Sequence, residues 1–162
     1  MSRRTASYVP PVGPLNATIM LVGEQPGKME VYARRPFAGP AGEELNSCLH
    51  SAGLSRGECY ITNTIKDLDV PVSEHLIYSR QTPVGFTDSG KEYLDLLKGE
   101  ITTVNPNVIV AVGAIAFLAL TERTGVTKWR GSFVPSTLVW GKKVIPTLHP
   151  TTVIPPKNQY LN

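Results

Sequence analysis

Two adjacent segments, Thr18-Ile-Met-Leu-Val22 and Gly23-Glu24-Gln25-Pro26-Gly27, set the architecture of this chain. The first holds five mostly β-favouring apolar residues and predicts a buried strand. The second predicts a tight turn at the carboxyl end of that strand. Open α/β sheets bind ligands beyond the carboxyl ends of their strands, so we expect this turn to form the floor of an active site. Its glycines let a ligand approach the main chain, and its proline stiffens the turn.

The rest of the chain alternates between strand-like and helix-like patterns. We expect strands over residues 18–22, 59–63 and 107–112, helices over 41–52, 90–104 and 114–122, and a hairpin around Gly141 that leads into a last strand ending at 147–152. Residues 28–40 and 66–89 have no clear period and are expected to be loops, the second with one helical turn. The alternation predicts an α/β fold, a three-layer α/β/α sandwich with a central, mainly parallel four-stranded sheet.

The composition is that of an ordinary globular protein. The chain has 162 residues, of which 41% are hydrophobic and 18% charged, which suits one domain with its own core. We expect an irregular lead-in over residues 1–17 and a single domain over 18–162. No apolar run approaches the roughly 20 residues of a membrane span. The basic N-terminus has no apolar segment after it, so we expect a cytoplasmic protein with no membrane partner.

Charge and cysteine content bear on partners and cofactors. The net charge is +3 and the pI is near 8.9, values that permit a polyanionic partner. Cys48 and Cys59 lack the spacing of a metal site and are expected to be buried thiols. We therefore expect no metal and no cofactor.

Polar side chains stand at the ends of three predicted strands. Glu24 and Gln25 follow the first strand, Asn63 ends the second, and His149 ends the last. Convergence of such groups at one sheet edge is how this architecture builds a site. The Asn63 amide offers a donor and an acceptor to a planar ring edge, and His149 offers a donor to an oxygen that gains negative charge. Phe37, in a loop stiffened by prolines, offers a stacking face.

Five motifs in order carry a resemblance to a known family: GEQPG, RPFAGPAG, YITNTIK, VNPNVIVAVG and TLHPTT. Together they resemble the uracil-DNA glycosylase superfamily, especially its family-four branch of bacteria, archaea and phages. The resemblance runs from about Ile19 to Ile154. It implies a DNA repair enzyme that hydrolyses the N-glycosidic bond of uracil flipped out of DNA and leaves an abasic site.

The resemblance also implies a role for individual residues. Glu24 and Gln25 match the turn that holds the attacking water and the scissile sugar. Phe37 matches the aromatic ring that stacks on uracil, and Asn63 the amide that binds the uracil edge. His149 matches the histidine that stabilises charge on the 2-carbonyl oxygen. Residues 150–154, with Pro150, Thr151 and Thr152, match the loop that enters the minor groove, and the flanking phosphates are expected to meet Lys28, Arg34, Gly39 and Pro40.

The sequence departs from the family in three ways. Family-four members carry four cysteines for an iron–sulfur cluster, whereas this chain has two, too few for a cluster of that kind. Gln25 stands where some branches have a catalytic aspartate, which leaves Glu24 as the candidate base or a mechanism driven mainly by anion stabilisation. The sequence ends soon after His149, so we expect a short phage-type form or a domain of a longer protein, for instance one fused to a replication enzyme.

Other readings stay open at this level. The chain could be a DNA-binding module of a replication protein that has lost turnover, or a glycosylase for another deaminated base such as hypoxanthine or xanthine. A small-molecule nucleotide-binding domain is disfavoured, because GEQPG has neither the glycine spacing of a dinucleotide fingerprint nor that of a P-loop. Each candidate residue also has a structural alternative: Glu24 as an exposed loop carboxylate, Gln25 as a cap of its own turn, Phe37 as ordinary core.

Overall fold

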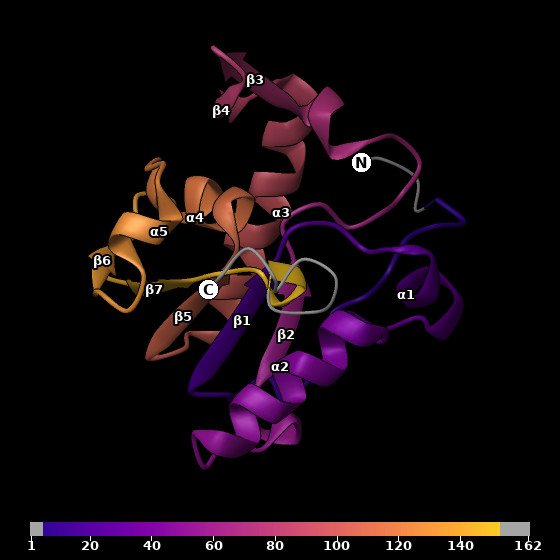
Figure 1. Cartoon of the computed structure of the whole chain (residues 1–162), viewed down its shortest axis with the longest axis vertical. Coiled ribbons are helices and arrows are strands. Elements are labelled where there is room, and N and C mark those ends of the chain that lie inside the picture. The colour runs from indigo at the N-terminus through magenta and orange to yellow at the C-terminus, as the bar shows by residue number, and fades with distance from the viewer. Residues whose placement is uncertain (1–4, 153–162) are drawn as a thin grey trace.

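The computed structural model describes residues 5–152 and shows a five-stranded sheet between helical layers (Figure 1). The strand order is β2-β1-β5-β7-β6. The first four strands are parallel, and β6 is an antiparallel edge strand. The strands of this sheet are β1 (Ile19–Gly23), β2 (Tyr60–Asn63), β5 (Val108–Val112), β6 (Val134–Pro135) and β7 (Lys143–Thr147). The predicted parallel α/β sandwich is confirmed, but the sheet has five strands rather than four.

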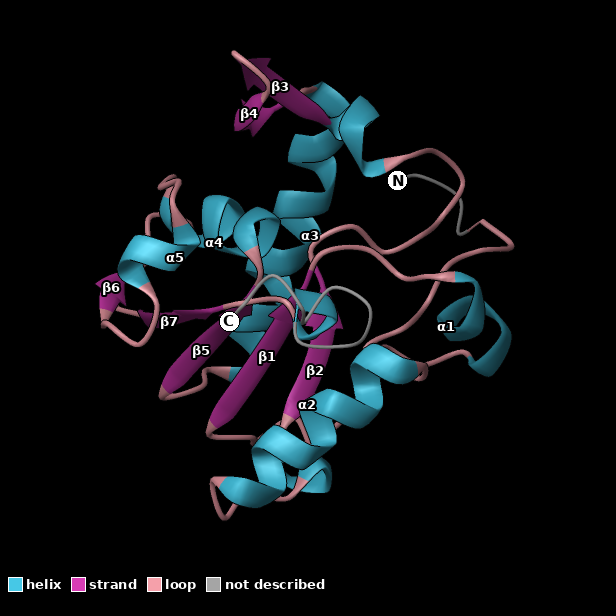
Figure 2. Cartoon of the chain, in the orientation of Figure 1, coloured by secondary structure: helices cyan, strands magenta, loops and turns pink. Residues whose placement is uncertain are grey.

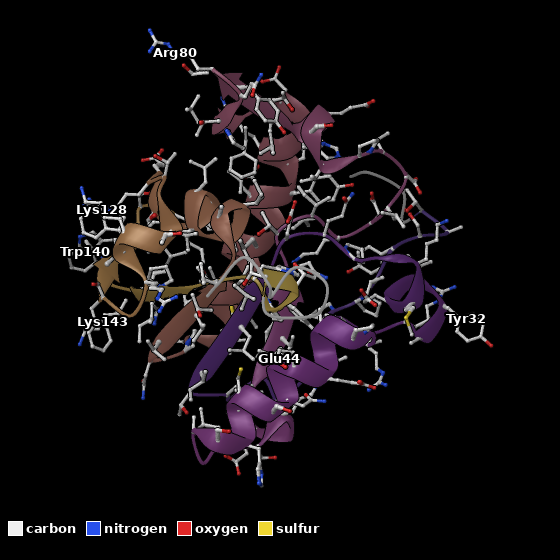
Figure 3. All side chains as sticks on the ribbon, viewed as in Figure 1. Tyr32, Glu44, Arg80, Lys128, Trp140 and Lys143 are labelled. Atoms are coloured by element: carbon white, nitrogen blue, oxygen red, sulfur yellow. The ribbon has the colours of Figure 1, made fainter. Side chains whose placement is uncertain are left out.

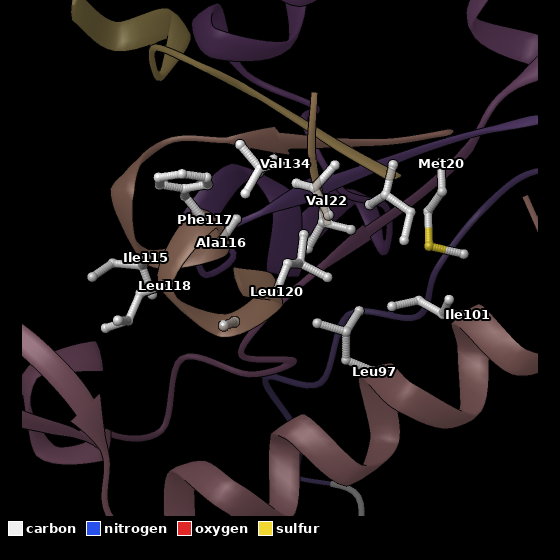
Figure 4. Packing of buried hydrophobic residues seen from close by; sticks show 14 of the residues in the cluster. Met20, Val22, Leu97, Ile101, Ile115, Ala116, Phe117, Leu118, Leu120 and Val134 are labelled. Carbon is white, nitrogen blue, oxygen red and sulfur yellow. The ribbon is translucent and has the colours of Figure 1, made fainter. Parts of the chain in front are cut away.

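Helices cover both faces of the sheet, as the period of two in β1 requires. Leu21 packs against α2 (Pro40–Ser51) through Leu45 and Leu49. Met20 and Val22 face the opposite cluster, which is built around α3 (Asp88–Val104) and α4 (Ala114–Thr121). Figure 4 shows this second cluster, where side chains of α3 and α4 meet those of β1. Because β1 is buried on both sides, its sequence is continuously apolar.

The three long helices lie close to their predicted positions. Leu97, Ile101 and Val104 form the buried face of α3. The side chain of Thr87 caps this helix by accepting a hydrogen bond from the backbone N–H of Gly90, which satisfies one of the free amides of the first turn. Nearly every residue of α4 is buried, because this helix lies between the sheet and β4 (Thr82–Phe86).

Two segments that were expected to be loops contain regular structure. Residues 28–40 include α1 (Lys28–Ala33), whose Glu30 side chain accepts from the backbone N–H of Gly27 at 3.2 Å. Residues 66–89 contain the 3-10 turn η2 (Val72–His75) and a hairpin of β3 (Leu76–Ser79) and β4 (Thr82–Phe86). The hairpin turn places Arg80 and Gln81 at positive φ. It therefore lacks the glycine signal by which such turns are found in sequences.

The hairpin expected around Gly141 is shorter than the pattern suggested. Only Val134 and Pro135 pair with β7, and residues 137–140 form no strand. The reason is Ser136, whose hydroxyl accepts from the backbone N–H groups of Leu138 and Val139, both at 3.1 Å. These bonds turn the chain away from the sheet. The remaining short elements are the 3-10 turns η1 (Arg56–Glu58) and η3 (Pro150–Thr152) and the helix α5 (Val126–Trp129).

The β3–β4 hairpin stands apart from the main sheet, beyond the N-terminal end of α3 (Figure 2). The segment before β1 is irregular but attached: Val12 forms an isolated bridge to Ile61 of β2. Within residues 5–152, no helix combines the length and the apolar character needed to cross a membrane.

Candidate active site at the carboxyl edge of the sheet

A cavity of about 300 Å³ opens at the carboxyl ends of β1, β2 and β7. It brings together six of the residues singled out in the sequence, although they come from opposite ends of the chain. The residues that line it are Glu24, Gln25, Gly27, Glu30, Phe37, Ala41, Asn63, His149 and Thr151. This is the position at which open α/β sheets bind their ligands.

The floor of the cavity depends on the absence of a side chain at Gly23. A Cβ atom there would lie 2.5 Å from Oδ1 of Asn63 and 2.7 Å from Cζ of Phe37, closer than real atoms approach. The Gly23 carbonyl accepts from both the backbone N–H and the hydroxyl of Thr64, each at 2.8 Å. The start of the GEQPG turn is thereby fastened to the residue that follows Asn63.

Asn63 is 4% exposed and ends β2, in register with Gly23 of β1. A buried ion pair lies beneath it: Lys66 contacts Glu100 of α3, and their side chains are 3% and 14% exposed. The Lys66 ammonium also donates to the backbone carbonyl of Asn63 at 2.5 Å and to the Thr62 hydroxyl at 2.6 Å.

Glu100 also connects this ion pair to β2 through hydrogen bonds. Its carboxylate accepts from the hydroxyls of Thr62 at 2.8 Å and Tyr60 at 3.0 Å. Burial lowers the pKa of Lys66, and the neighbouring Glu100 carboxylate opposes that shift. Burial, followed by the charge of Glu100, raises the pKa of Tyr60. The end of β2 thus rests on a hydrogen-bonded polar network inside the core.

Phe37 reaches the cavity from a loop with a strained backbone. Its φ is +53°, in the left-handed region that non-glycine residues seldom adopt. Nη1 of Arg56 donates to the Phe37 carbonyl at 2.8 Å, and Nη2 donates to the Pro36 carbonyl. The loop also sits against the first turn of α2, because a Cβ at Gly42 would lie 1.7 Å from the Phe37 carbonyl oxygen. Arg56 and Gly42 together hold this conformation.

His149 follows β7 and faces Phe37, with 6.3 Å between the ring centroids. Its Nδ1 accepts a hydrogen bond from the backbone N–H of Thr151 at 3.3 Å and contacts the Thr151 hydroxyl at 2.9 Å. A nitrogen that accepts from an N–H carries no proton, so this geometry favours the neutral tautomer with its proton on Nε2. Gly113, at φ +97°, backs the ring: a Cβ there would lie 3.4 Å from Cβ of His149.

Glu24 and Gln25 occupy the cavity in different ways. Burial raises the pKa of the Glu24 carboxyl, as expected for an acid in a partly dry site. The Gln25 amide nitrogen donates to the carbonyls of Asp67 at 3.0 Å and Val70 at 2.8 Å. Gln25 therefore connects the GEQPG turn to the segment that follows β2, while Glu24 lines the cavity.

The predicted DNA contacts surround the cavity without lining it, apart from Thr151. Lys28 starts α1 and Arg34 ends it, both exposed. Gly39 and Pro40 begin α2 beside Ala41, which lines the cavity. Pro150 and Thr152 belong to η3 and line a neighbouring groove. Residues 153 and 154 of the same predicted loop lie outside the described residues.

The cysteines do not fit an iron–sulfur cluster. The chain has two, whereas a cluster of this kind takes four cysteine ligands. Cys59 is buried as expected, but Cys48 is exposed, because it lies on the rim of the groove beside α2 rather than under the helix. Among residues 5–152, no group of three or more His, Cys, Asp or Glu side chains is arranged to hold a metal ion.

Sequence reasoning missed the residues that support the site. Arg56 lies outside every motif, and nothing in its neighbourhood indicates that it reaches the Phe37 loop. Lys66 stands at the end of the YITNTIK motif, directly after a buried strand, and a lysine at such a position is a usable signal. Its partner Glu100 lies 34 positions away on α3, and no local pattern links the two.

The fold is that of an open α/β domain, and its cavity lies at the carboxyl edge of the parallel sheet, where such domains bind ligands. Residues 10–159 match the Uracil DNA glycosylase superfamily, and the chain belongs to that superfamily.

Several curated proteins are similar to this chain. The type-4 uracil-DNA glycosylase of Thermotoga maritima is 36% identical over 144 residues, which cover 88% of this chain and 69% of that protein. The enzyme of the same name from Archaeoglobus fulgidus is 34% identical over 161 residues, 95% of this chain and 75% of that protein. A DNA polymerase of Bacillus phage SP01 is 32% identical over 143 residues, 88% of this chain but 14% of that protein.

Proposed function

We propose that this protein is a uracil-DNA glycosylase, a DNA repair hydrolase that cleaves the N-glycosidic bond of uracil in DNA and leaves an abasic site. The observation that carries the proposal is the single cavity that gathers Glu24, Phe37, Asn63 and His149 at the carboxyl edge of the sheet. Its support is membership of the superfamily and similarity to proteins named type-4 uracil-DNA glycosylase.

Recognition requires the base to leave the helix. A base inside a duplex must first be unstacked, at a cost of a few kcal/mol, before a pocket can bind it. The Asn63 amide is suited to pair with the donor and acceptor edge of uracil, and the Phe37 ring is suited to stack on its face. Both side chains approach each other over Gly23, so one flat ring would meet both at once.

Cleavage of the glycosidic bond leaves negative charge on the base and positive charge on the sugar. We assign His149 to the base and Glu24 to the water that attacks the sugar. The bond between the sugar and uracil breaks with its electron pair passing to the base, and water adds to the sugar carbon. With its proton on Nε2, His149 donates to the uracil oxygen that becomes negative. Glu24, as a carboxylate, orients the water and accepts its proton. The Gln25 amide keeps the turn in place through its two bonds to backbone carbonyls.

The rim of the cavity is suited to hold the DNA strand. We assign phosphate contacts to Lys28 and Arg34, and to the backbone at Gly39 and Pro40, where the N-terminus of α2 favours an anion. We assign the minor-groove contact to the loop that contains Pro150, Thr151 and Thr152. These residues are exposed or partly exposed next to the cavity, apart from Gly39 and Pro150.

A second candidate is a module that binds uracil-DNA without turnover inside a longer replication protein. The observation in its favour is the similarity to one seventh of a phage DNA polymerase. The similarity to proteins named as glycosylases favours the enzyme. The same DNA partner is proposed in both cases, and an association with replication proteins is compatible with either.

The test is single-turnover release of free uracil from a single-stranded oligonucleotide with one central uracil. We expect release by the protein, none from a matched oligonucleotide with thymine, and less from oligonucleotides with hypoxanthine or xanthine. Salt-dependent binding to the uracil oligonucleotide with the substrate recovered intact would favour the module. Faster release of hypoxanthine than of uracil would make another deaminated base the substrate.

A further inference from the structure

A second surface with the chemistry of nucleic-acid binding lies away from the cavity. Three aromatic and three basic side chains of α5, of the segments on either side of β6 and of the start of β7 form it. We call it the aromatic–basic patch: Lys128, Trp129, Arg130, Phe133, Trp140 and Lys143. Trp140 is 96% exposed and Phe133 is 68% exposed. Figure 3 shows Lys128, Trp140 and Lys143 gathered at one end of the molecule, opposite Tyr32.

The part of the chain that forms the patch has an excess of positive charge. Between residues 105 and 152, five of the six charged side chains are basic, and the one acidic residue is Glu122. The cations lie against the aromatic rings: the Lys143 ammonium is 5.8 Å from the centre of the Phe133 ring, and the Lys128 ammonium is 5.6 Å from that of Trp129. Rings interleaved with cations are how proteins bind single-stranded nucleic acid, by base stacking and phosphate contact.

A groove of about 450 Å³ shares His149 with the cavity and Arg130 with the patch. Its lining also includes Pro150 and Gly131. Ile145 and Thr147 form its wall along β7, and Lys143 points to the same face of that strand because side chains alternate. The backbone N–H of Gly131 donates to the Pro146 carbonyl at 3.0 Å, which holds this part of the groove to β7.

The length of the groove suits a short stretch of DNA. From Lys143 to Thr147, the extent of β7, the chain rises by about 13 Å at the usual spacing of an extended strand. His149 lies two residues further on, so a few nucleotides span the distance. We infer that the groove and the aromatic–basic patch bind the single-stranded DNA that flanks the uracil, with a base stacked on Trp140 and phosphates at Lys128, Arg130 and Lys143. This inference rests on the proposed function.

A substitution in the opposite wall of the groove is expected to raise the affinity for DNA rather than lower it. Glu44 of α2 lines the groove (Figure 3), and its carboxylate repels a phosphate backbone that passes beneath it. Glu44→Gln is therefore expected to tighten DNA binding, whereas changes in the patch weaken it. Glu44 is partly exposed on the helix and belongs to neither hydrophobic cluster, so the substitution leaves the core intact.

The test measures binding of uracil-free single-stranded oligonucleotides by fluorescence anisotropy. Trp140→Ala is expected to weaken binding of a 20-nucleotide strand roughly tenfold, the effect of losing one base–aromatic stack. Lys128→Ala is expected to reduce the slope of log affinity against log salt by about 0.7, as for one phosphate contact to a single strand. Arg80→Ala, in the distant β3–β4 hairpin (Figure 3), is the matched control and should change neither quantity.

Length dependence separates this inference from the proposed function. Strands of about five nucleotides centred on uracil would not reach the patch, so Trp140→Ala should leave their cleavage unchanged and slow the cleavage of longer strands below saturation. If the parent protein releases uracil and the patch variants bind long strands as the parent does, the inferred role of the patch is wrong and the proposed glycosylase activity stands. If the patch variants bind long strands more weakly but neither they nor the parent release uracil, the inferred DNA-binding role of the patch is supported and the proposed glycosylase activity is wrong.

Two further results would overturn the inference. Dimers of the parent protein that Trp140→Ala converts to monomers in analytical ultracentrifugation would assign the patch to a second copy of the chain. Equal weakening of duplex and single-strand binding by Trp140→Ala would remove the role of stacking. Since Trp140 is almost fully exposed, its substitution is not expected to alter folding, which circular dichroism melting checks.

Discussion

Asn63 and Phe37 face the same cavity but are held there by different kinds of structure. Asn63 ends a buried strand and rests on a network that contains the buried Lys66–Glu100 pair. Phe37 belongs to a loop at positive φ, and one partly exposed side chain, Arg56, binds the carbonyls that fix it. The comparison teaches that Asn63 is part of the folding core, whereas Phe37 is held in place by a side chain at the surface.

The largest expected effect is on stability, and it tests whether the buried network beneath Asn63 is part of the folding core. Lys66→Met leaves the Glu100 carboxylate buried without its counter-ion, and removal of one partner of a buried pair costs about 3–5 kcal/mol. Urea unfolding should show this loss. The double variant Lys66→Met/Glu100→Gln removes the charge as well and should recover much of the stability.

Lys98→Met is the matched control, because Lys98 is exposed on the same helix as Glu100. A surface change of this kind should alter the free energy of unfolding by no more than about 0.5 kcal/mol. A loss as small as this for Lys66→Met would mean that the network beneath Asn63 contributes little to stability.

The next effect concerns catalysis. His149→Ala and Asn63→Asp should each slow single-turnover uracil release about 10²-fold, as loss of one preorganised donor does in other enzymes. Their effects on stability should differ: His149 lies on a loop after β7, so its variant should unfold almost as the parent does, whereas Asn63→Asp puts a charge in the buried end of β2. His50→Ala, on the exposed side of α2, should leave uracil release unchanged. Equal destabilisation by both variants would contradict the comparison.

Arg56→Ala tests whether the Arg56 side chain holds the loop that carries Phe37. Loss of the donors to Pro36 and Phe37 should lower the free energy of unfolding by about 1–3 kcal/mol and weaken binding of uracil-DNA, because the Phe37 ring loses its position. The rate at saturating DNA should change less than the binding constant does. Arg56→Lys keeps the charge but not the two-pronged geometry, so it should restore only part of the effect. Arg35→Ala, an exposed neighbour, serves as the control for charge.

The smallest effect is a dependence on pH. Burial raises the pKa of Glu24 in the folded protein, so the folded state holds this proton more tightly than the unfolded state does. That contribution to stability is complete below the unfolded pKa and is lost as pH rises through the folded pKa. Glu24→Gln should therefore raise the melting temperature at pH 7 slightly, and the gain should vanish in acid. A variant that melts below the parent at pH 7 would contradict this sign.

The predictable part of the molecule is the part that local sequence patterns encode. The strand-end positions of Glu24, Asn63 and His149 followed from buried apolar runs, because a parallel sheet brings the ends of its strands to one edge. The β3–β4 hairpin has no glycine at its turn, and the hydroxyl of Ser136 ends the Gly141 hairpin early. Such contacts depend on the folded chain.

The supporting residues escaped prediction for a related reason. Arg56 reaches back 19 and 20 positions to the Phe37 loop. Lys66 is recognisable from its motif, but the Glu100 that makes its burial tolerable is visible only in three dimensions. Sequence patterns thus identify the groups that face a ligand more readily than the groups that hold them.

The bare backbone at Gly23 has a consequence for substrate range. The Asn63 amide and the Phe37 ring are separated by the space of one missing methyl group. Under the proposed function, this space limits the thickness of a ring that can contact both side chains. A single added carbon at position 23 would displace both side chains, and the selectivity among damaged bases would shift even though neither side chain had itself been replaced.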